Sequence, residues 1–413
     1  MKKQTKYIFK TFALVSVLTY SWSLNAQHLE TLISIGLANN PEIQKFDLQY
    51  QIASEKVNEV NALPNTEVVV GYFVSPPETR TGPQVVKVSV KQMIPWFGSV
   101  TSRSKYAASL ADVQYETIAI AKRKLLSTVS QSYYNMWAIK AKQAVFSQQI
   151  ALLKNYEKWA LTAVEVSKAS VVDVLKIQIR QNDVEQLNAV LEQEYLAEQS
   201  RLNLLLNRSE KQQINITDTL IMPEVADLNT ENMVTALHPE LLQYDKLYES
   251  VEQSELLNQK ERAPMVGFGL DYITVNKRND MPIDNNGKDI IMPMLSLSIP
   301  VFNKGFTSKT KQNELKKLEL NADKLAKKNA LETVLEQAVN ARNSAKISFE
   351  TATKNLEKAK DAERLLLTAY ETETVNFNDV LDIQELQLKF QINNIEAVKN
   401  YYTQQNIIKY LSQ

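Results

Sequence analysis

The sequence predicts a mainly α-helical protein with a small β part, built by duplication of one structural repeat. Three observations support this fold class. Only eight of the 413 residues are glycine, whereas Ala, Leu, Lys, Glu and Gln are abundant, a composition typical of long helices. Short motifs recur in the same order about two hundred residues apart, which indicates an internal duplication. Long stretches also carry apolar residues at seven-residue spacing, as in coiled coils.

The N-terminus has the pattern of a secretory signal peptide. Four lysines accompany an apolar run from Ile8 to Trp22, and Leu24-Asn25-Ala26 follows it, so cleavage is expected before Gln27. The run of roughly 15 residues is shorter than the about 20 that a membrane-spanning helix needs, and no other stretch comes closer. The sequence therefore predicts a signal peptide at residues 1–26 and excludes a helical integral membrane protein.

The charge balance and the absence of cysteine exclude several classes of function. Loss of the signal peptide removes four lysines and no acidic residue from a chain with 47 basic and 47 acidic residues. The mature chain is then mildly acidic, so no nucleic-acid partner is expected. The absence of cysteine excludes disulfides, thiolate metal sites, a cysteine nucleophile and a lipidated N-terminal cysteine.

Three motif pairs mark the two repeats, each pair 198 to 206 residues apart. In each repeat a Pro-Glu dipeptide opens a helix, an Ile-Pro segment follows the strands, and Asp-Val-Leu begins the last helix. The pairs are Asn40-Pro41-Glu42 with His238-Pro239-Glu240, Ile94-Pro95-Trp96-Phe97-Gly98 with Ile299-Pro300-Val301-Phe302-Asn303-Lys304-Gly305, and Asp173-Val174-Leu175 with Asp379-Val380-Leu381. We assign the first repeat to residues 27–207, a linker to 208–231 and the second repeat to 232–413.

Each repeat is predicted to contain a helix, two strands, a very long helix, a break and a further helix. Seven-residue seams run along both long helices, through Leu125, Val129, Ser132, Met136, Ile139, Gln143, Phe146 and Ile150, and through Leu331, Leu335, Ala338, Arg342, Ala345, Phe349, Ala352 and Leu356. The helices are expected near residues 30–62, 98–166, 171–207, 232–263, 305–372 and 376–412. The strands are expected at residues 66–73, 85–93, 265–275 and 291–300.

Element lengths indicate how copies of the chain could assemble. A helix of about 68 residues is roughly 100 Å long, and the two shorter helices of each repeat, stacked end to end, would match it. Strands of about 8 to 11 residues have the length of tilted transmembrane strands. Two hairpins are too few to close a barrel, and a bilayer tolerates no open sheet edge. Membranous strands would therefore require several protomers that pool their hairpins.

The duplicated Pro-Glu helix openings, Ile-Pro-x-Phe segments and Asp-Val-Leu segments give the chain a strong resemblance to the TolC-like outer-membrane factors of tripartite efflux systems. The resemblance covers essentially the whole mature chain. It implies a homotrimer in the outer membrane, with a twelve-stranded barrel to which each protomer adds four strands and a long helical periplasmic tunnel. Residues 208–231 and the C-terminal end would supply a small belt around the tunnel.

The same resemblance implies a passive exit duct with no enzymatic activity, cofactor or metal centre. Its partners would be a periplasmic adaptor (membrane fusion protein), an inner-membrane efflux pump of the RND type and outer-membrane lipid. The loop at residues 76–83 and the Ile94 to Gly98 segment look most like relatives that accompany heavy-metal pumps. Heavy-metal cations are therefore one expected class of substrate.

Site residues follow from the resemblance as well. Asp379 and Asp382 lie three residues apart on one helix face, and by family analogy they would line the narrow periplasmic entrance of the tunnel. Asp173 occupies the corresponding place in the first repeat. It would accept a hydrogen bond from Tyr370 and help to hold the helices closed.

Two departures from the family pattern fall close to these residues. The glycines that usually stand at the periplasmic tip are replaced by Ser167 and Glu373, and an arginine shortly before the second Asp-Val-Leu is replaced by Val375. Adaptor docking and latching of the gate are therefore expected to differ in detail from the family.

Two alternatives remain open. A periplasmic adaptor or a coiled-coil scaffold would also carry heptad seams, but in an adaptor a helical hairpin lies inside β-rich domains, the reverse of the order here. A secreted enzyme would need a nucleophile, a base and an orienting partner, and no such arrangement is recognisable. His28 and His238 are the only histidines and lie far apart in sequence, so neither is expected to be a catalytic base or a metal ligand.

Overall fold

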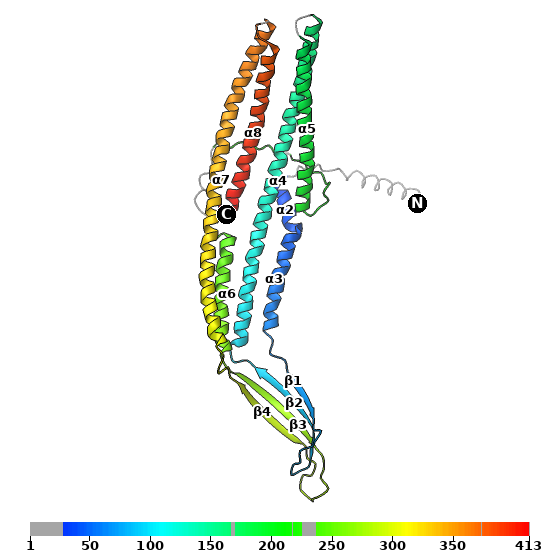
Figure 1. Ribbon diagram of the computed structural model, residues 1–413, viewed down its shortest axis with the longest axis vertical. Helices are drawn as coiled ribbons and strands as arrows, with labels where there is room; N and C mark the ends of the chain where they lie inside the picture. Colours follow the sequence, from blue (N-terminus) through cyan, green and yellow to red (C-terminus); the bar gives the residue numbers. More distant parts are fainter. Residues whose placement is uncertain (1–27, 167–169, 217, 225–236, 373, 413) are drawn as a thin grey trace, which may run out of the picture. The chain divides into compact units, whose positions relative to one another are not determined.

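The computed structural model describes residues 28–166, 170–216, 218–224, 237–372 and 374–412, so the predicted signal peptide lies outside the described residues. The order of elements repeats once, because α3-β1-β2-α4-α5 is followed by α6-β3-β4-α7-α8 (Figure 1). The prediction of a mainly helical chain with a small β part is confirmed. The elements are α2 (Leu29–Asn39), α3 (Pro41–Val60), β1 (Glu67–Tyr72), β2 (Gln84–Ile94), α4 (Ser99–Glu165), α5 (Val171–Leu205), α6 (Pro239–Glu261), β3 (Met265–Val275), β4 (Ile290–Ser298), α7 (Gly305–Glu371) and α8 (Phe377–Ser412).

The single helix predicted at residues 30–62 is wrong, because the structure has two helices there. The helix α2 ends at Asn39 and α3 begins at Pro41. Asn40 between them has an extended backbone with ψ of 124°, since a proline disfavours the helical conformation in the residue before it. The Asn40 side-chain amide donates a hydrogen bond to the Leu205 carbonyl at 2.9 Å. The Asn-Pro-Glu motif therefore breaks one helix and starts the next.

The chain forms two compact units, and each contains segments of both predicted repeats. Unit 1 comprises residues 1–40, 123–233 and 335–412, and unit 2 comprises residues 41–122 and 234–334 together with residue 413. Two of the boundaries between the units fall inside the long helices α4 and α7. Each compact unit is thus formed by segments of the two repeats that pack against each other, and not by one repeat alone.

Unit 1 contains the hairpin of α4 with α5 and the hairpin of α7 with α8 (Figure 1). The predicted seams are its core: Val129, Ser132 and Met136 on α4 are fully buried, as is Arg342 on α7. The Arg342 guanidinium donates a hydrogen bond to the Gln405 side-chain oxygen on α8 at 3.1 Å. The seven-residue spacing therefore marks the side chains that hold the helices of unit 1 together.

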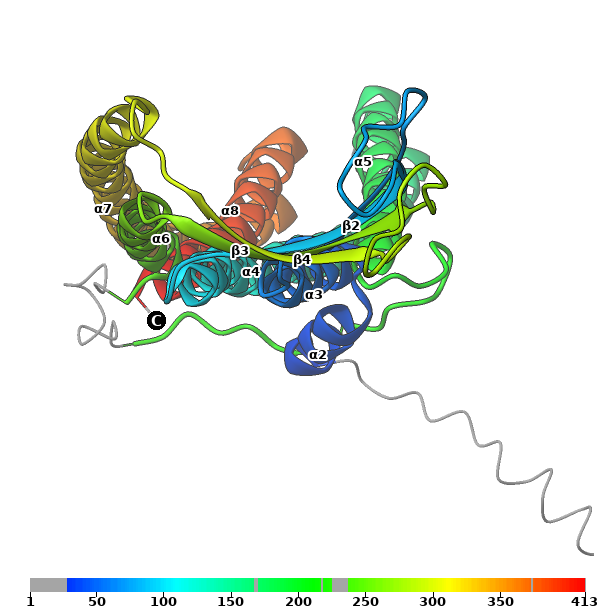
Figure 2. The same ribbon diagram turned by 90° about the horizontal axis from the view of Figure 1, so that it is seen from below.

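Unit 2 contains an antiparallel sheet in the order β1-β2-β3-β4 (Figures 1 and 2). The central pairing of β2 with β3 joins the two repeats, with Ser89 opposite Asp271. Gly267 in β3 has no room for a side chain, because an added Cβ would lie 2.2 Å from the Ser296 hydroxyl oxygen and 2.4 Å from the Met93 sulfur. The side chains of Ser296 and Met93 on the neighbouring strands occupy the space beside this glycine.

Candidate entrance and membrane-facing sheet

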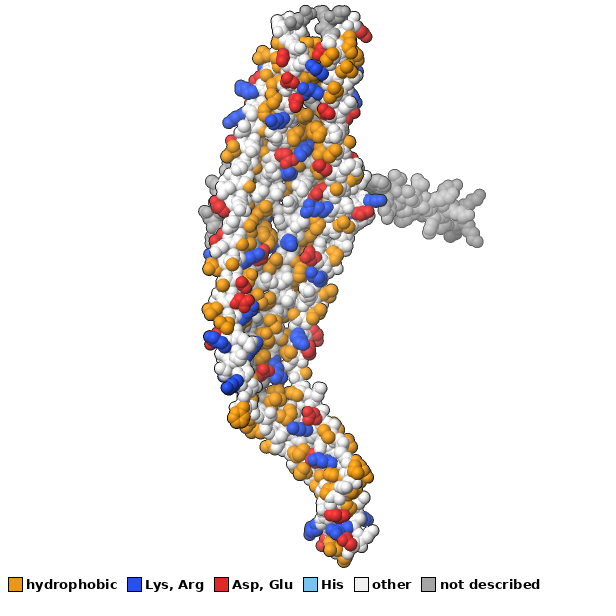
Figure 3. All heavy atoms as spheres, in the orientation of Figure 1, with side chains coloured by type: hydrophobic (Ala, Val, Ile, Leu, Met, Phe, Trp, Pro, Cys, Tyr) orange, Lys and Arg blue, Asp and Glu red, His pale blue; other side chains and the backbone are white. Residues whose placement is uncertain are grey.

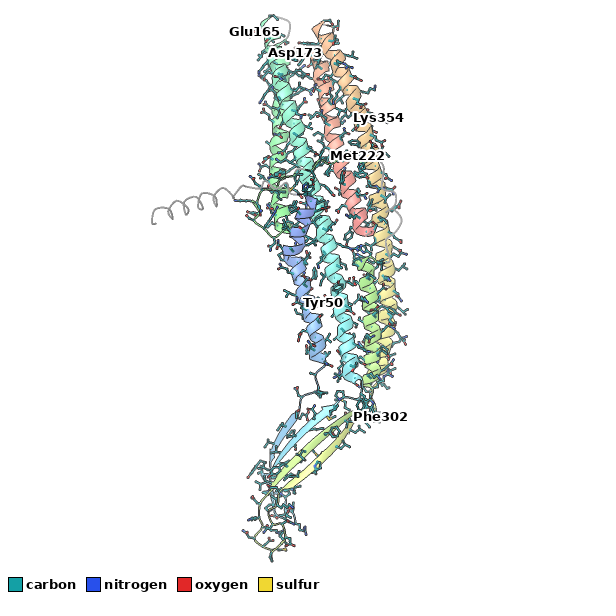
Figure 4. The ribbon with its side chains drawn as sticks, turned by 180° about the vertical axis from the view of Figure 1, so that it is seen from behind. Tyr50, Glu165, Asp173, Met222, Phe302 and Lys354 are labelled. Carbon is teal, nitrogen blue, oxygen red and sulfur yellow. The ribbon has the colours of Figure 1, made fainter. Side chains whose placement is uncertain are left out.

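The candidate entrance lies where α5 and α8 begin, at the hairpin tips of unit 1. Ser170 caps α5, because its hydroxyl accepts a hydrogen bond from the Val172 amide at 3.1 Å. The Asp173 carboxylate in turn accepts a hydrogen bond from the Ser170 amide at 3.3 Å, which completes a capping box. Figure 4 shows Asp173 at this tip. The sequence-predicted latch residue is therefore held rigidly in the first turn of its helix.

Asp379 and Asp382 lie in the first two turns of α8, and both are exposed. Their environments differ, because Asp382 accepts a hydrogen bond from Arg180 of α5 at 3.0 Å. Arg180 also forms an ion pair with Glu385, one turn further along α8. The structure thus brings a cation to one of the two predicted entrance carboxylates.

Arg180 and Glu385 were not found by sequence reasoning, although the repeat contains a signal for them. Lys176 and Asp382 are 206 residues apart and occupy equivalent repeat positions, yet they have opposite charges. The structure places these oppositely charged faces of α5 and α8 against each other. The Lys176 ammonium donates a hydrogen bond to the Asn378 side chain at 3.0 Å. The polar contacts of Arg180 and of Lys176 therefore join α5 to α8 near the tip.

Tyr370 of α7 lies in an aromatic group next to the entrance. Its ring centroid is 5.1 Å from that of Phe377, which is 5.6 Å from that of Tyr156. Burial raises the pKa of the Tyr370 hydroxyl, and the negative charge of Asp173 raises it further. The structure thus places Asp173 within electrostatic reach of Tyr370. The hydrogen bond expected between them stays a prediction.

The departures at the tip are only partly described. Ser167 and Glu373 lie outside the described residues, whereas Val375 lies in the turn before α8 and is half-buried. The half-buried Glu363 carboxylate of α7 joins three helices. The Tyr156 hydroxyl donates to Glu363 at 3.0 Å, and the Gln387 amide donates to the same carboxylate at 2.7 Å.

The two histidines have structural partners. His28 contacts the Asp218 carboxylate at 2.7 Å. His238 accepts a hydrogen bond from the Glu240 amide at 3.3 Å and so caps α6. Among the described residues, no group of three or more His, Cys, Asp or Glu side chains is placed to hold a metal ion.

The sheet of unit 2 has one apolar face. Alternate residues of a strand point to opposite faces, and the register makes one face of the four strands almost wholly apolar. This apolar face consists of Val68, Val70, Tyr72, Val86, Val88, Val90, Ile94, Val266, Phe268, Leu270, Tyr272, Ile291, Pro293, Leu295 and Leu297. Its exceptions, Gln92 and Thr274, lie near the two ends of the strands.

The opposite, polar face carries charged and small side chains. Lys87 of β2 forms an ion pair with Asp271 of β3, whose side chain is fully buried. The charged, polar and small residues of the polar face are Glu67, Gly71, Lys87, Ser89, Lys91, Gly267, Gly269, Asp271, Ser296 and Ser298. The same face also carries the apolar residues Val69, Met93, Met265, Ile273, Ile290, Met292 and Met294. Within the described residues, β1 and β4 each pair with only one strand, so both outer edges of the sheet are open.

No helix in the described part of the chain is both long and apolar enough to cross a membrane. No protein-family model and no curated protein matches the sequence.

Solved structures share the fold over nearly the whole chain. The outer membrane protein VceC of Vibrio cholerae matches with a TM-score of 0.73 and 12% identity over 93% of this chain and 96% of its own. The CmeC outer membrane channel of Campylobacter jejuni matches with a TM-score of 0.73 and 11% identity over 95% and 90%. The open state of the MtrE outer membrane channel of Neisseria gonorrhoeae matches with a TM-score of 0.71 and 16% identity over 93% and 88%. The chain thus has the fold of TolC-like outer-membrane channels, as the sequence resemblance predicted.

Proposed function

We propose that the protein is the outer-membrane channel of a tripartite efflux system and acts as a passive exit duct. The observation that carries the proposal is the four-stranded sheet, with its apolar face, its polar face and its two open edges. A channel wall in a bilayer needs one face for lipid and one for water. The likeness of the whole chain to outer-membrane channels supports the same function.

Closure of the sheet requires further copies of the chain. An open sheet edge in the hydrocarbon region leaves peptide groups without hydrogen bonds, which costs several kcal/mol for each group. In the proposed homotrimer, the β1 edge of one protomer pairs with the β4 edge of the next, which gives twelve strands. The helical hairpins of unit 1 would then form a periplasmic tunnel around the same axis.

The proposed partners act at the far end of this tunnel. A periplasmic adaptor would dock at the hairpin tips, and an inner-membrane pump of the RND type would deliver the substrate. The entrance would be formed by Asp379 and Asp382, with Asp173, Tyr370 and Arg180 holding the helices closed. No chemical step is assigned to the chain itself.

Cell fractionation tests the proposal directly. We expect mature protein that begins at Gln27 and is recovered from the outer-membrane fraction as a detergent-stable trimer with heat-modifiable gel mobility. Mass spectrometry of the N-terminus and native gels before and after boiling provide the measurement. A soluble periplasmic monomer would contradict the channel and favour the adaptor or scaffold alternative.

The substrate class is a separate proposal, which rests on the loop at residues 76–83 and the Ile94 to Gly98 segment. We expect a deletion strain to lose tolerance to copper, silver, zinc or cobalt, and complementation by the intact chain to restore it. Growth on graded concentrations of each metal, with dyes and antibiotics in parallel, measures the effect. If the deletion strain keeps its metal tolerance but becomes sensitive to drugs, the substrates are organic compounds rather than metal cations. The proposed channel function would still hold.

A further inference from the structure

Apolar side chains remain exposed where the sheet ends and the helices α4 and α7 begin. Phe302 is 95% exposed and Phe97 86%, and Val301 is 69% exposed. Figure 4 shows Phe302 at this junction, and Figure 3 shows hydrophobic side chains gathered around it. We call this group the junction collar and define it as Trp96, Phe97, Ile299, Val301 and Phe302.

The junction collar makes little contribution to the packing of the described chain. Trp96 and Phe97 contact each other edge to face, with ring centroids 5.9 Å apart, yet Phe97 remains largely open to solvent and Trp96 is 42% exposed. An exposed aromatic group of this kind marks a surface that meets something other than water. Both Ile-Pro segments of the duplicated repeat contain such a phenylalanine two residues after the proline.

The collar continues the apolar face of the sheet. Ile94 pairs with Val266, which pairs with Leu297, so the apolar face reaches the ends of β2 and β4. The collar residues Trp96 and Ile299 follow shortly after these two strand ends in the chain. From Val86 to Ile94 the face covers about 27 Å of strand. At a tilt of about 40° this gives a band of roughly 20 Å, less than the about 25 Å of a transmembrane barrel. The collar adds the missing height.

Exposed lysines lie just beyond the collar on the helices. Lys105, Lys260, Lys304 and Lys309 are exposed, and none of the four forms an ion pair within the described residues. Glu261, the acid beside Lys260, is paired with Arg103 at 3.0 Å. In contrast, the next lysines along α7 are all paired with acids, namely Lys311, Lys316, Lys317, Lys324, Lys327 and Lys328.

Helix stability explains one of these lysines, Lys260, because it lies in the last turn of α6, where a positive charge favours the helix dipole. It does not explain the other three. The first turn of α7 contains no acidic residue, and a positive charge such as Lys304 at a helix N-terminus opposes the helix dipole. A membrane surface explains them together with the collar. Aromatic rings favour the boundary between headgroups and acyl chains, and lysines reach to the lipid phosphates.

We propose that the junction collar and its four lysines bind the headgroup region of the adjacent phospholipid leaflet and enrich anionic phospholipids there. The proposal rests on the proposed function, because it requires the sheet to cross a bilayer. The collar sets the depth of insertion through its aromatic rings. The lysines select the lipid charge, since each attracts an anionic surface over about a Debye length.

Depth-dependent fluorescence quenching tests the position of the collar. The variant Trp137→Phe/Trp159→Phe leaves Trp96 as the sole tryptophan of the mature chain, and its trimer is reconstituted in vesicles that contain phospholipids brominated near the headgroup or near the chain end. Shallow bromines are expected to quench Trp96 at least twofold more strongly than deep bromines. A parallel variant that adds Trp96→Phe and Leu270→Trp reports the middle of the apolar face and is expected to show the reverse order.

The two tryptophan reporters distinguish failure of the collar proposal from failure of the channel proposal. Deep quenching of the Leu270→Trp reporter without shallow quenching of Trp96 would overturn the collar and leave the channel intact. Quenching of neither reporter would overturn both proposals. If the double Trp→Phe background does not form trimers, the chain with its native tryptophans is used instead, and loss of shallow quenching in Trp96→Phe then reports the collar.

The same assay tests the lysines. We compare shallow-brominated phosphatidylglycerol with shallow-brominated phosphatidylcholine at equal mole fraction, and we expect about twofold stronger quenching of Trp96 by the anionic lipid. The variant Lys260→Gln/Lys304→Gln/Lys309→Gln, which keeps only Lys105 of the four, should lower this ratio towards one. The matched control Lys311→Gln/Lys316→Gln/Lys317→Gln, which removes paired lysines, should keep it. A ratio of one in the parent chain, or an unchanged ratio in the first variant, would overturn the selection of anionic lipid.

Discussion

Val68→Arg is expected to abolish the outer-membrane trimer. Val68 lies on the apolar face of the edge strand β1, opposite Val90, and is 62% exposed in the single chain. A lipid-facing arginine near the middle of a bilayer costs about 2–4 kcal/mol, and a trimer would carry three. The sum is comparable to the whole stability of a typical domain. The measurement is the fraction of heat-modifiable trimer in outer membranes.

The neighbouring residue provides the matched control. Val69 lies on the same strand but on the polar face, opposite Ser89, and it is 59% exposed. We expect Val69→Arg to form trimers at close to the parent level, because its guanidinium would face the aqueous lumen. Equal loss of trimers in both variants would show that β1 does not separate lipid from water, and the proposed wall would be wrong.

Arg180→Gln is expected to raise the resting conductance of the channel. Arg180 of α5 binds Asp382 and Glu385 of α8, and glutamine removes the charge while it keeps much of the side chain. A partly exposed ion pair contributes about 0.2–1 kcal/mol. Three copies acting together would shift the balance of closed and open entrances roughly threefold to a hundredfold. Single-channel recording in planar bilayers measures the shift.

The same variant should also increase cation selectivity, because Asp382 and Glu385 lose their counter-charge at the entrance. Asp379→Ala with Asp382→Ala should act in the opposite direction, since a ring of carboxylates attracts cations and offers multivalent cations a blocking site. Lys154→Gln is the control, because Lys154 pairs with Glu185 at 3.4 Å within the α4–α5 hairpin. If Arg180→Gln conducts and selects like this control, Arg180 does not latch the entrance.

The helices and strands were predictable because their signals are local. Heptad seams such as Leu125, Val129 and Ser132 indicate which face of a helix is buried, without identifying the partner helix. The error at residues 30–62 has a local cause as well. Pro41 disfavours the helical conformation in the preceding residue, Asn40, so the helical pattern of residues 30–62 belongs to two helices.

Only part of the candidate entrance could be predicted from the sequence. Asp379 and Asp382 could be placed on one helix face from their spacing, because a helix fixes which residues are neighbours along itself. Arg180 is about two hundred residues away from Asp382 in sequence. Its contact depends on how two hairpins pack, which no periodicity within one helix reveals.

The sequence by itself determined the duplication, the order and type of the elements, and which residues of each strand and helix share a face. These properties follow from interactions between residues close together in the chain, where the periods of 2 and 3.6 residues act. The tertiary structure alone decided the pairing of β2 with β3, the partition into two units that each draw on both repeats, and the clamp of Arg180 on Asp382 and Glu385. These properties depend on contacts between residues distant in sequence, whose energies are set by geometry that appears only when the helices and strands pack.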